Sequence, residues 1–249
     1  MRTLNRIVAL TISLTFLSTG LLAQTYMPAA DTPAHIRAAV QSPERSEEDT
    51  VRDVNRKPAE VLTLAGLNEG DHIIELSSLG QYYSTILSAA IGPEGQLDMY
   101  DLPPWQRFGA DESGIAFARS HANAGYTMVF YHDAPYEQNV DAVFNVLSYH
   151  DLQPTGVDTA QMNALLFAAL KPGGKYIVID HRDDAGADWS DAAEMHRIDP
   201  ALVIEEVTAA GFELVTESSL LANPEDDHSV RVFNLEGPSD RFLLIFQKP

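Results

Sequence analysis

The amino-acid sequence predicts an α/β fold in which a mostly parallel, doubly wound sheet has helices on both faces. Two observations support this. Short apolar stretches alternate with segments of helical periodicity along most of the chain, and glycine and proline clusters separate them. The 249 residues are 45% hydrophobic, which suffices for a sizeable core and fits one α/β domain better than two.

The first 23 residues are typical of a secretory signal peptide. Arg2 and Arg6 precede an apolar stretch over residues 7–22, and Ala23 stands before Gln24, the expected start of the mature chain. Thr and Ser interrupt this stretch, which is shorter than the roughly 20 apolar residues of a spanning helix, so a permanent anchor is the lesser alternative. We therefore expect an exported protein, periplasmic or secreted, with no stable membrane insertion after leader removal.

The composition is strongly acidic. Sixteen Lys and Arg against 36 Asp and Glu give a formal net charge of −20, and loss of the leader arginines leaves 14 against 36, or −22. Such a polyanion should repel nucleic acid and anionic membranes. With no cysteine, the chain has no disulfide framework. We expect a small-molecule substrate and no nucleic-acid partner, and the sequence carries no signal for an oligomeric state.

The elements follow in order from local signals. Residues 24–56 are rich in Pro, Ala and acids, and we expect an N-terminal arm with a short helix at residues 47–54 that packs on the domain of residues 57–249. Pro58 stands at a favoured first helical position, and Gly66 can end that helix.

A buried strand is predicted next, followed by a helix in which apolar residues recur at i, i+3, i+4 and i+7. The strand is His72–Leu76, and the helix carries Tyr83, Ile86, Leu87 and Ala90.

Six further apolar stretches predict strands. They lie at residues 97–100, 126–131, 140–147, 176–179, 212–215 and 242–246. Further helices are predicted at residues 113–124, after the capping-box pattern of Asp158 and Gln161, and after the cap of Asp199 and Pro200. The chain therefore ends in two strands with an acidic loop, and no helix, between them.

Several short motifs, taken together, resemble class I S-adenosylmethionine-dependent methyltransferases. They are EL at the end of the first strand, LKPGGKYIVIDH and AAGFELV. More narrowly, RKPAEVL, GQYY, YHDL, DH and HRID resemble a group of exported predicted methyltransferases. The likeness runs from about residue 46 to residue 249. It implies a Rossmann-like, seven-stranded sheet with an antiparallel last strand and S-adenosylmethionine as the cofactor.

The resemblance also implies where the cofactor binds, at the carboxyl ends of the parallel strands. The turn after the first strand would hold the methionine part of the cofactor. An acid after the second strand would bind the ribose, and residues after the third strand would contact the adenine. Carried over position by position, these cofactor-binding residues are Glu75, Ser77, Gly80, Tyr82, Asp101 and Asp133. Core packing is the alternative role of Tyr82, and the two aspartates have an alternative role as solubilising loop acids.

The first turn departs from the usual acid-x-Gly-x-Gly-x-Gly pattern. Aligned on Glu75, the three glycine positions hold Ser77, Leu79 and Gln81. Glycine serves such turns because it adopts positive φ and lets a ligand approach the backbone. A left-handed non-glycine residue costs roughly 1–2 kcal/mol, which a folded domain can absorb. The volume of the side chains that replace glycine matters more than this strain. The direction of the Leu79 side chain therefore decides whether a cofactor fits.

Polar residues follow the fourth and fifth parallel strands and should converge over one crevice. The catalytic candidates are Tyr149, His150, Asp151, Asp180, His181 and Arg182. Glu194, His196 and Arg197 lie in a third segment that should reach the same crevice. The hypothesis is that His150 or His181 removes a proton from a methyl acceptor and that Asp151 or Asp180 orients it. The competing interpretation is a helix cap or a satisfied loop hydrogen bond.

Three functional hypotheses follow. The first is an exported methyltransferase-like enzyme that acts on a small molecule. The second is a non-catalytic, exported ligand-binding module with a lapsed cofactor site. The third is a metal-dependent hydrolase on the same scaffold. Because no compact motif such as H-E-x-x-H occurs, we name no metal ligand, although His and carboxylate side chains suit several divalent ions.

Overall fold

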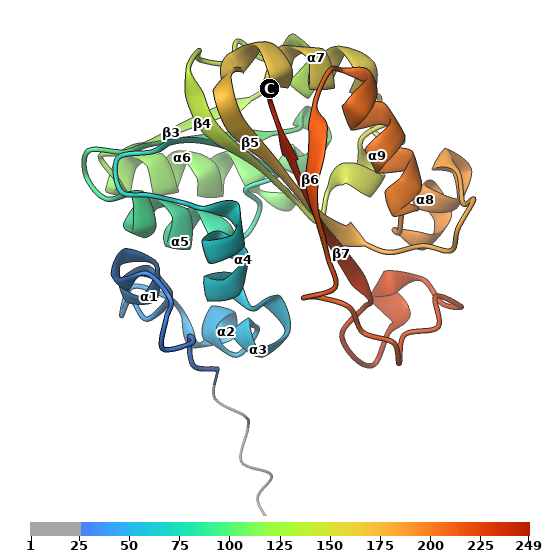
Figure 1. Ribbon diagram of the computed structural model, residues 1–249, viewed down its shortest axis with the longest axis horizontal. Helices are drawn as coiled ribbons and strands as arrows, with labels where there is room; N and C mark the ends of the chain where they lie inside the picture. The colour runs from blue at the N-terminus through green and yellow to red at the C-terminus, as the bar shows by residue number, and fades with distance from the viewer. Residues whose placement is uncertain (1–25) are drawn as a thin grey trace, which may run out of the picture.

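The computed structural model describes residues 26–249, which form one seven-stranded sheet with helices on both faces (Figure 1). The predicted signal peptide lies outside the described residues. The strands are β1 (His72–Leu76), β2 (Gln96–Asp101), β3 (Ala124–Met128), β4 (Val140–Val146), β5 (Leu170–His181), β6 (Glu213–Ser218) and β7 (Arg241–Gln247).

The sheet has the spatial order β3-β2-β1-β4-β5-β7-β6. The first five strands of this order are parallel, and β7 pairs antiparallel with both β5 and β6. The predicted α/β class, the seven strands and the antiparallel last strand are therefore confirmed. Strand order reverses between β1 and β4, so the carboxyl ends of these two strands are the expected place for a ligand.

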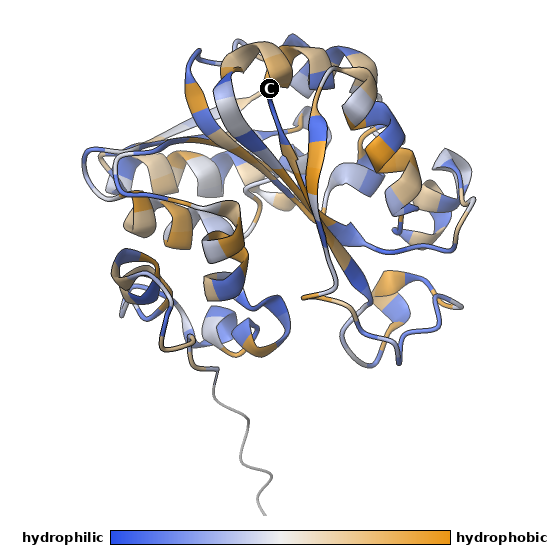
Figure 2. Cartoon of the chain, viewed as in Figure 1, coloured by the Kyte–Doolittle hydropathy of each residue, from blue (hydrophilic) through white to orange (hydrophobic). Residues whose placement is uncertain are grey.

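Two layers of helices cover the sheet. One face packs against α1 (Ala34–Val40), α4 (Pro58–Ala65) and α5 (Tyr82–Ile91), and the other against α7 (Thr159–Ala169) and α9 (Pro200–Ala209). The remaining helices are α2 (Glu47–Thr50), α3 (Asp53–Arg56), α6 (Ala110–Ser120) and α8 (Trp189–Met195). Figure 2 shows hydrophobic stretches along the central strands and their helices, as expected of a sheet buried on both faces.

The carboxyl ends of the parallel strands lie at the lower edge of the sheet in Figure 1. Helices α2 and α3 flank this edge on one side, and the irregular segment of residues 219–240 flanks it on the other. These two segments, far apart in the sequence, are therefore the neighbours of any ligand bound there.

Local signals set several element ends. Gly66 ends α4 with φ 72°, and the carboxylate of Asp199 caps α9 by accepting from Ala201 N at 2.8 Å. Asp158 accepts from Gln161 N as predicted, but the Gln161 amide donates to His132 O instead of completing a capping box.

Other predictions are corrected by tertiary contacts. The single helix expected at residues 47–54 is two short helices, because Asp53 turns inward to pair with Arg45. The strand expected at residues 126–131 ends at Met128, since Tyr131 enters a short 3₁₀ turn and donates to Tyr100 O at 3.1 Å. Helix α8, which we did not predict, begins with a capping box between Asp188 and Asp191.

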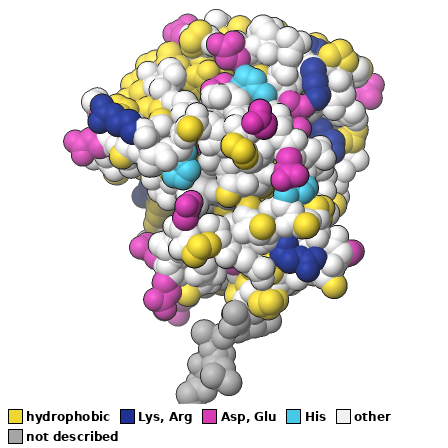
Figure 3. All heavy atoms as spheres, turned by 90° about the vertical axis from the view of Figure 1, so that its left-hand side faces the viewer, with side chains coloured by type: hydrophobic (Ala, Val, Ile, Leu, Met, Phe, Trp, Pro, Cys, Tyr) yellow, Lys and Arg dark blue, Asp and Glu magenta, His cyan; other side chains and the backbone are white. Residues whose placement is uncertain are grey.

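Acidic side chains are scattered over the face shown in Figure 3, and basic side chains lie in small separate groups. Among residues 26–249, no helix combines the length and apolar character needed to cross a bilayer.

Candidate ligand site at the carboxyl edge of the sheet

Two polar sites lie at the carboxyl ends of the parallel strands. The first, called the arginine pocket, lies between α3 and the turn that follows β1, and its charged lining is Arg52, Arg56 and Glu75. The second, called the histidine cluster, consists of His150, Asp151, Asp180 and His196, which follow β4, end β5 or precede α9.

The turn after β1 adopts the backbone that glycines usually provide, although it holds larger residues. Ser77, Gly80 and Gln81 have φ of 69°, 80° and 47°. Ser77 N donates to Tyr100 O at 2.9 Å, which ties the turn to β2. The two non-glycine residues cost about 1–2 kcal/mol each in this region, so packing around the turn sustains a backbone that the sequence disfavours.

The side chains of this turn leave a hollow open. Leu79 is 43% exposed and lines the arginine pocket at its edge, and Gln81 turns away to donate to Ser113 Oγ at 3.1 Å. The pocket has a volume of about 170 Å³. This is less than the roughly 300 Å³ at the lower end for drug-sized ligands, so the hollow matches a group of amino-acid size.

The cations of the arginine pocket lack a full set of anionic partners. Within residues 26–249, the Arg56 guanidinium has no ion pair, and Arg52 pairs with the partly exposed Asp49. Burial, and then the charge of Arg52, lower the pKa of Arg56 to about 10, with Arg241 acting in the same direction. Two of these arginines, Arg52 and Arg56, line the pocket, where an anionic ligand group would offset the repulsion between them.

The same pocket is lined by a buried acid, one oxygen of which has no hydrogen bond within the described residues. Glu75 is 3% exposed, and its Oε2 has no hydrogen bond within residues 26–249. Burial raises the pKa of Glu75 to about 8, the neighbouring Ser84 opposes that rise by hydrogen bonding, and the charge of Asp101 adds to it. A cationic ligand group would satisfy the buried Oε2.

Helix α3 is held in place by a buried ion pair. Both guanidinium nitrogens of Arg45 donate to Asp53 at 2.7 Å, and the Tyr82 hydroxyl donates to the same carboxylate at 2.5 Å. The Arg56 guanidinium lies 4.3 Å from the centre of the Tyr82 ring. Tyr82, predicted to bind a cofactor, therefore lines the pocket and also anchors the arm that carries its arginines.

Asp101, the predicted ribose acid, is fully buried at the end of β2. Its two oxygens accept from Ser78 N at 2.8 Å and Ser78 Oγ at 2.9 Å. Burial raises its pKa, and the Ser78 hydrogen bonds oppose that rise. The carboxylate of Asp101 thus holds the turn after β1 in this conformation. The side chain of Asp133, the predicted adenine contact, is 65% exposed and lies 3.6 Å from His132.

The histidine cluster brings together three of the predicted catalytic residues and His196. His150 Nδ1 lies 2.7 Å from Asp180 Oδ1, and His150 N donates to Asp180 Oδ2 at 2.9 Å. His150 Nε2 lies 3.5 Å from Asp151 Oδ2 and 3.4 Å from His196 Nδ1. Burial lowers the pKa of His150, but the charge and hydrogen bond of Asp180 outweigh it and raise the pKa above its ordinary value.

His181 lies in a different environment from His150. Its Nδ1 lies 2.6 Å from Ser239 Oγ, and burial lowers its pKa to about 3. His181 is therefore neutral at ordinary pH and is a weak base.

Tyr149 and Arg182 serve contacts outside the histidine cluster. Tyr149 is fully buried, and its hydroxyl donates to Glu206 at 2.9 Å and accepts from Asn163 at 3.0 Å. Arg182 Nε lies 3.4 Å from Asp240 in the loop before β7. Both positions suit structural roles, and the catalytic roles given to these two residues stay predictions.

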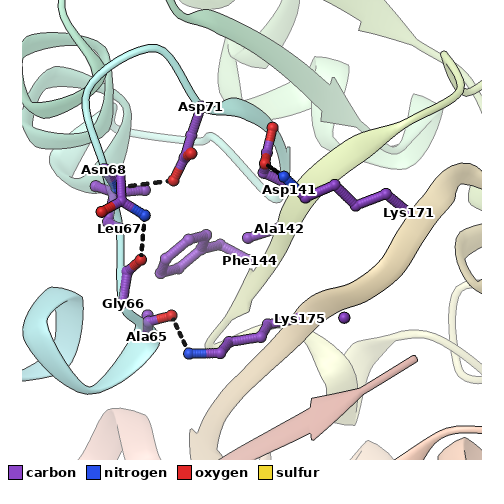
Figure 4. Close-up of a pocket in the computed structure, with 11 residues that line it drawn as sticks. Ala65, Gly66, Leu67, Asn68, Asp71, Asp141, Ala142, Phe144, Lys171 and Lys175 are labelled. Atoms are coloured by element: carbon purple, nitrogen blue, oxygen red, sulfur yellow. Dashed lines mark hydrogen bonds and ion pairs between the residues drawn. The ribbon is translucent and has the colours of Figure 1, made fainter. Parts of the chain in front are cut away.

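Another pocket, of about 240 Å³, lies at the amino ends of the strands, where Lys171 contacts Asp141 and Lys175 donates to Ala65 O (Figure 4). Ligands of doubly wound sheets bind at the carboxyl ends, so this cleft is not the candidate site.

Sequence reasoning assigned no role to Arg52 and Arg56, which contribute the cations of the arginine pocket. The signal that could have found Arg56 was the RKPAEVL motif, in which it is the first residue. Its place two residues before Pro58, at the start of the helix that leads to the first strand, could have suggested a contact at the carboxyl edge of the sheet.

Searches of family profiles and of curated proteins find no match to this chain. Solved structures do match. A SAM-dependent methyltransferase from Aquifex aeolicus has a TM-score of 0.59 at 16% identity, over 82% of this chain and 96% of its own. Another match is geranyl diphosphate C-methyltransferase from Streptomyces coelicolor A3(2), solved with Mg²⁺, geranyl diphosphate and S-adenosyl-L-homocysteine. Its TM-score is 0.57 at 16% sequence identity, and the match covers 86% of this chain and 89% of that enzyme.

A third similar structure is the cyclase SpnF, with a TM-score of 0.58 at 16% identity over 83% of each chain. Identities this low compare folds, not activities. The chain therefore has the fold of S-adenosylmethionine-dependent methyltransferases, and its function must be argued from its own site.

Proposed function

We propose that the protein binds S-adenosylmethionine by its methionine end in the arginine pocket and methylates a small molecule. The observation that carries the proposal is the charge pattern of this pocket, in which two arginines lie near the buried carboxyl of Glu75, whose Oε2 has no hydrogen bond within residues 26–249. That pattern is complementary to an α-amino acid, which carries one carboxylate and one ammonium group.

Each charged group of the pocket has a counterpart on the amino-acid end of the cofactor. Arg52 and Arg56 would hold the carboxylate, and Glu75 would ionise to accept from the ammonium. Charge-assisted hydrogen bonds of this kind contribute about 1.5–3 kcal/mol each. The volume of about 170 Å³ suits the amino-acid end, so the adenosyl part would extend beyond this pocket.

When bound, the cofactor supplies the methyl group, and the residues of this chain have to hold the acceptor in line with it. That is chiefly a positioning task. The acceptor's expected place is the same edge of the sheet, where the histidine cluster follows β4 and β5.

Isothermal titration calorimetry tests the proposal with S-adenosylmethionine, S-adenosylhomocysteine, methionine and adenosine. We expect micromolar binding of the first two, weaker binding of methionine, and no measurable binding of adenosine. Arg56→Met and Arg52→Met should each weaken S-adenosylmethionine binding by about 10–100-fold, since each removes one charge-assisted contact. The matched control is Arg107→Met, because Arg107 lies on an exposed turn and packs against Phe108. No binding at millimolar cofactor, or unchanged affinity in both variants, contradicts the proposal.

One observation favours a second candidate, a module that binds a free amino acid. Asp101 already accepts two hydrogen bonds from Ser78, so it offers little to a ribose in this conformation. The same titrations separate the candidates. The module is favoured if methionine binds as tightly as S-adenosylmethionine, and the methyltransferase is favoured if the adenosyl part adds affinity.

We further propose that the protein acts outside the cytoplasm, because its first residues have the composition of a signal peptide. Cell fractionation with N-terminal sequencing of the mature chain tests this. A chain that starts near Gln24 in the exported fraction is the expected result, and an intact chain in the cytoplasm contradicts it.

A further inference from the structure

We propose that His150, Asp151 and His196 form a binding site for a divalent transition-metal ion of the zinc type. This inference is independent of the proposed methyl transfer. It rests on one group of side chains from two separate segments, a 3₁₀ turn after β4 and the loop between α8 and α9.

The spacing of the two imidazoles matches a tetrahedral ion, because His150 Nε2 and His196 Nδ1 are 3.4 Å apart. Asp151 has one oxygen 3.5 Å from His150 Nε2 and its other oxygen 3.4 Å from His196 Nδ1, and one ligand atom from each of the three side chains lies within 4.8 Å of the other two. Two ligands bound at 2.0–2.1 Å with tetrahedral angles lie about 3.3–3.4 Å apart. Adjacent ligands of an octahedral Mg²⁺ lie closer, at about 2.9 Å. Two imidazoles and one carboxylate are also a donor set that suits zinc and its neighbours.

The partner of His150 prepares it as a ligand. Asp180 is fully buried and lies 2.7 Å from His150 Nδ1, so this nitrogen carries the proton and Nε2 keeps its lone pair for the cluster. A carboxylate that orients the second nitrogen of a ligating histidine is a recurrent feature of metal sites. The geometry therefore suits His150 to a ligand role, and the base role predicted from the sequence stays a prediction.

His196 is held in the cluster by a disfavoured backbone. It ends α8 with φ 54°, a left-handed conformation that costs a non-glycine residue roughly 1–2 kcal/mol. The next residue, Arg197, is fully buried in an ion pair with Asp226 at 2.9 Å, which fixes the chain at this point. Strain sustained by its surroundings is typical of functional positions.

Solvent reaches the cluster from one side. The side chains of His150, His196 and Asp151 are 4%, 16% and 26% exposed, so an ion can enter past Asp151 and His196. Three protein ligands leave a fourth position for water or a substrate oxygen, as in catalytic zinc sites. The ligand class that this site would take is therefore a small molecule with a hydroxyl or carboxylate oxygen.

Arg231 competes with the ion. Its guanidinium nitrogen lies 2.5 Å from His196 Nε2, and because arginine only donates, Nε2 must accept and Nδ1 must carry the proton. Metal binding needs the opposite tautomer, so the exposed Arg231 would have to move away. Removing Arg231 should therefore tighten binding, both by freeing the ring and by removing a nearby positive charge.

The test uses the purified protein after chelator treatment, titrated with Zn²⁺ by calorimetry and with Co²⁺ by visible absorption. We expect one ion per chain and the intense visible bands of tetrahedral cobalt. His150→Ala, Asp151→Ala and His196→Ala should each abolish these bands, and Asp180→Asn should weaken binding by about 10–100-fold. Arg231→Ala should strengthen binding.

The matched control is His228→Ala. His228 also lies between two aspartates, with its Nδ1 2.9 Å from Asp184 and its Nε2 3.2 Å from Asp240. Because the two aspartates contact opposite sides of the ring, they cannot bind the same ion together with one nitrogen of His228. This variant should bind like the unaltered protein. Circular dichroism shows whether each variant is folded, and a folded His150→Ala or His196→Ala protein that keeps the cobalt bands overturns the proposal. Weak octahedral cobalt spectra, or no binding by the unaltered protein, also overturn it.

Discussion

At the scale of single residues, the turn after β1 shows how a ligand site can persist without its usual glycines. Ser77 and Gln81 adopt positive φ, and Leu79 stays at the surface. Ser77 and Leu79 line the arginine pocket, and Gln81 turns away from it. The carboxyl that this part of the chain contributes to the pocket comes from Glu75, the acid before the turn.

Glu75 should make the stability of the protein depend on pH. Its pKa is about 8 in the folded state against 4.5 as the ordinary value, so the folded state holds the proton more tightly. This stabilisation is fully present below pH 4.5 and is lost as the pH rises toward 8, by at most about 1.4 kcal/mol per pH unit. Glu75→Gln cannot ionise and does not lose this contribution. In urea titrations, the unfolding free energy of the variant should therefore increase relative to that of the unaltered protein as the pH rises from 4.5 to 8.

The control for this comparison is Glu94→Gln, at an exposed loop position. It should follow the unaltered protein at every pH. A constant difference between Glu75→Gln and the unaltered protein from pH 5 to pH 8 would show that Glu75 ionises normally in the folded state.

At the scale of elements, the arm before the α/β domain takes part in the site. Helix α3 is only four residues long, too short to be stable alone. The Arg45–Asp53 ion pair and the Tyr82 hydroxyl hold it against α5. Because Arg52 and Arg56 flank Asp53 on this segment, the same contacts set the position of both pocket cations.

Asp53→Asn should therefore damage both stability and binding. It leaves the side chain of Arg45, which is 1% exposed, without a charged partner, and breaking a buried pair in this way costs about 3–5 kcal/mol. Thermal unfolding and titration with S-adenosylmethionine measure the two effects. Asp49→Asn removes the exposed pair with Arg52 and should cost less than about 1 kcal/mol. Equal losses in the two variants would contradict the role given to the buried pair.

Much of the architecture follows from local patterns, but the site depends on contacts between distant segments. The strand His72–Leu76 and the helix that Pro58 begins are predictable because their periodicity and punctuation lie within a few residues. Convergence of His150 with Asp180 also follows, because both stand at carboxyl ends of neighbouring parallel strands.

The arginine pocket could not be predicted in the same way. The inward turn of Asp53 depends on Arg45 and Tyr82, and no periodicity encodes that meeting. The approach of His196 to His150 depends on the left-handed end of α8, a helix that apolar spacing did not reveal.

At the scale of the whole molecule, basic residues are few: 16 Lys and Arg stand against 36 Asp and Glu, which gives a net charge of −20. Several arginines are used inside the protein instead of on its surface. Arg45 and Arg197 form buried ion pairs, and Arg56 lies at the ligand pocket. The surface is consequently left with a large excess of acids, which repel one another in the folded state.

This excess predicts that monovalent salt stabilises the fold. Raising NaCl shortens the range of repulsion between surface acids to about 10 Å at 0.1 M and less above it, so the melting temperature at pH 8 should rise between 0.02 and 0.5 M. Chelator in every sample keeps divalent ions out of the comparison. Near pH 5, close to the sequence pI of about 4.5, the net charge is small and the same salt series should change the melting temperature little. A melting temperature that is flat or falls with salt at pH 8 would mean that the surface acids are already balanced by local pairs, contrary to the excess that the composition gives.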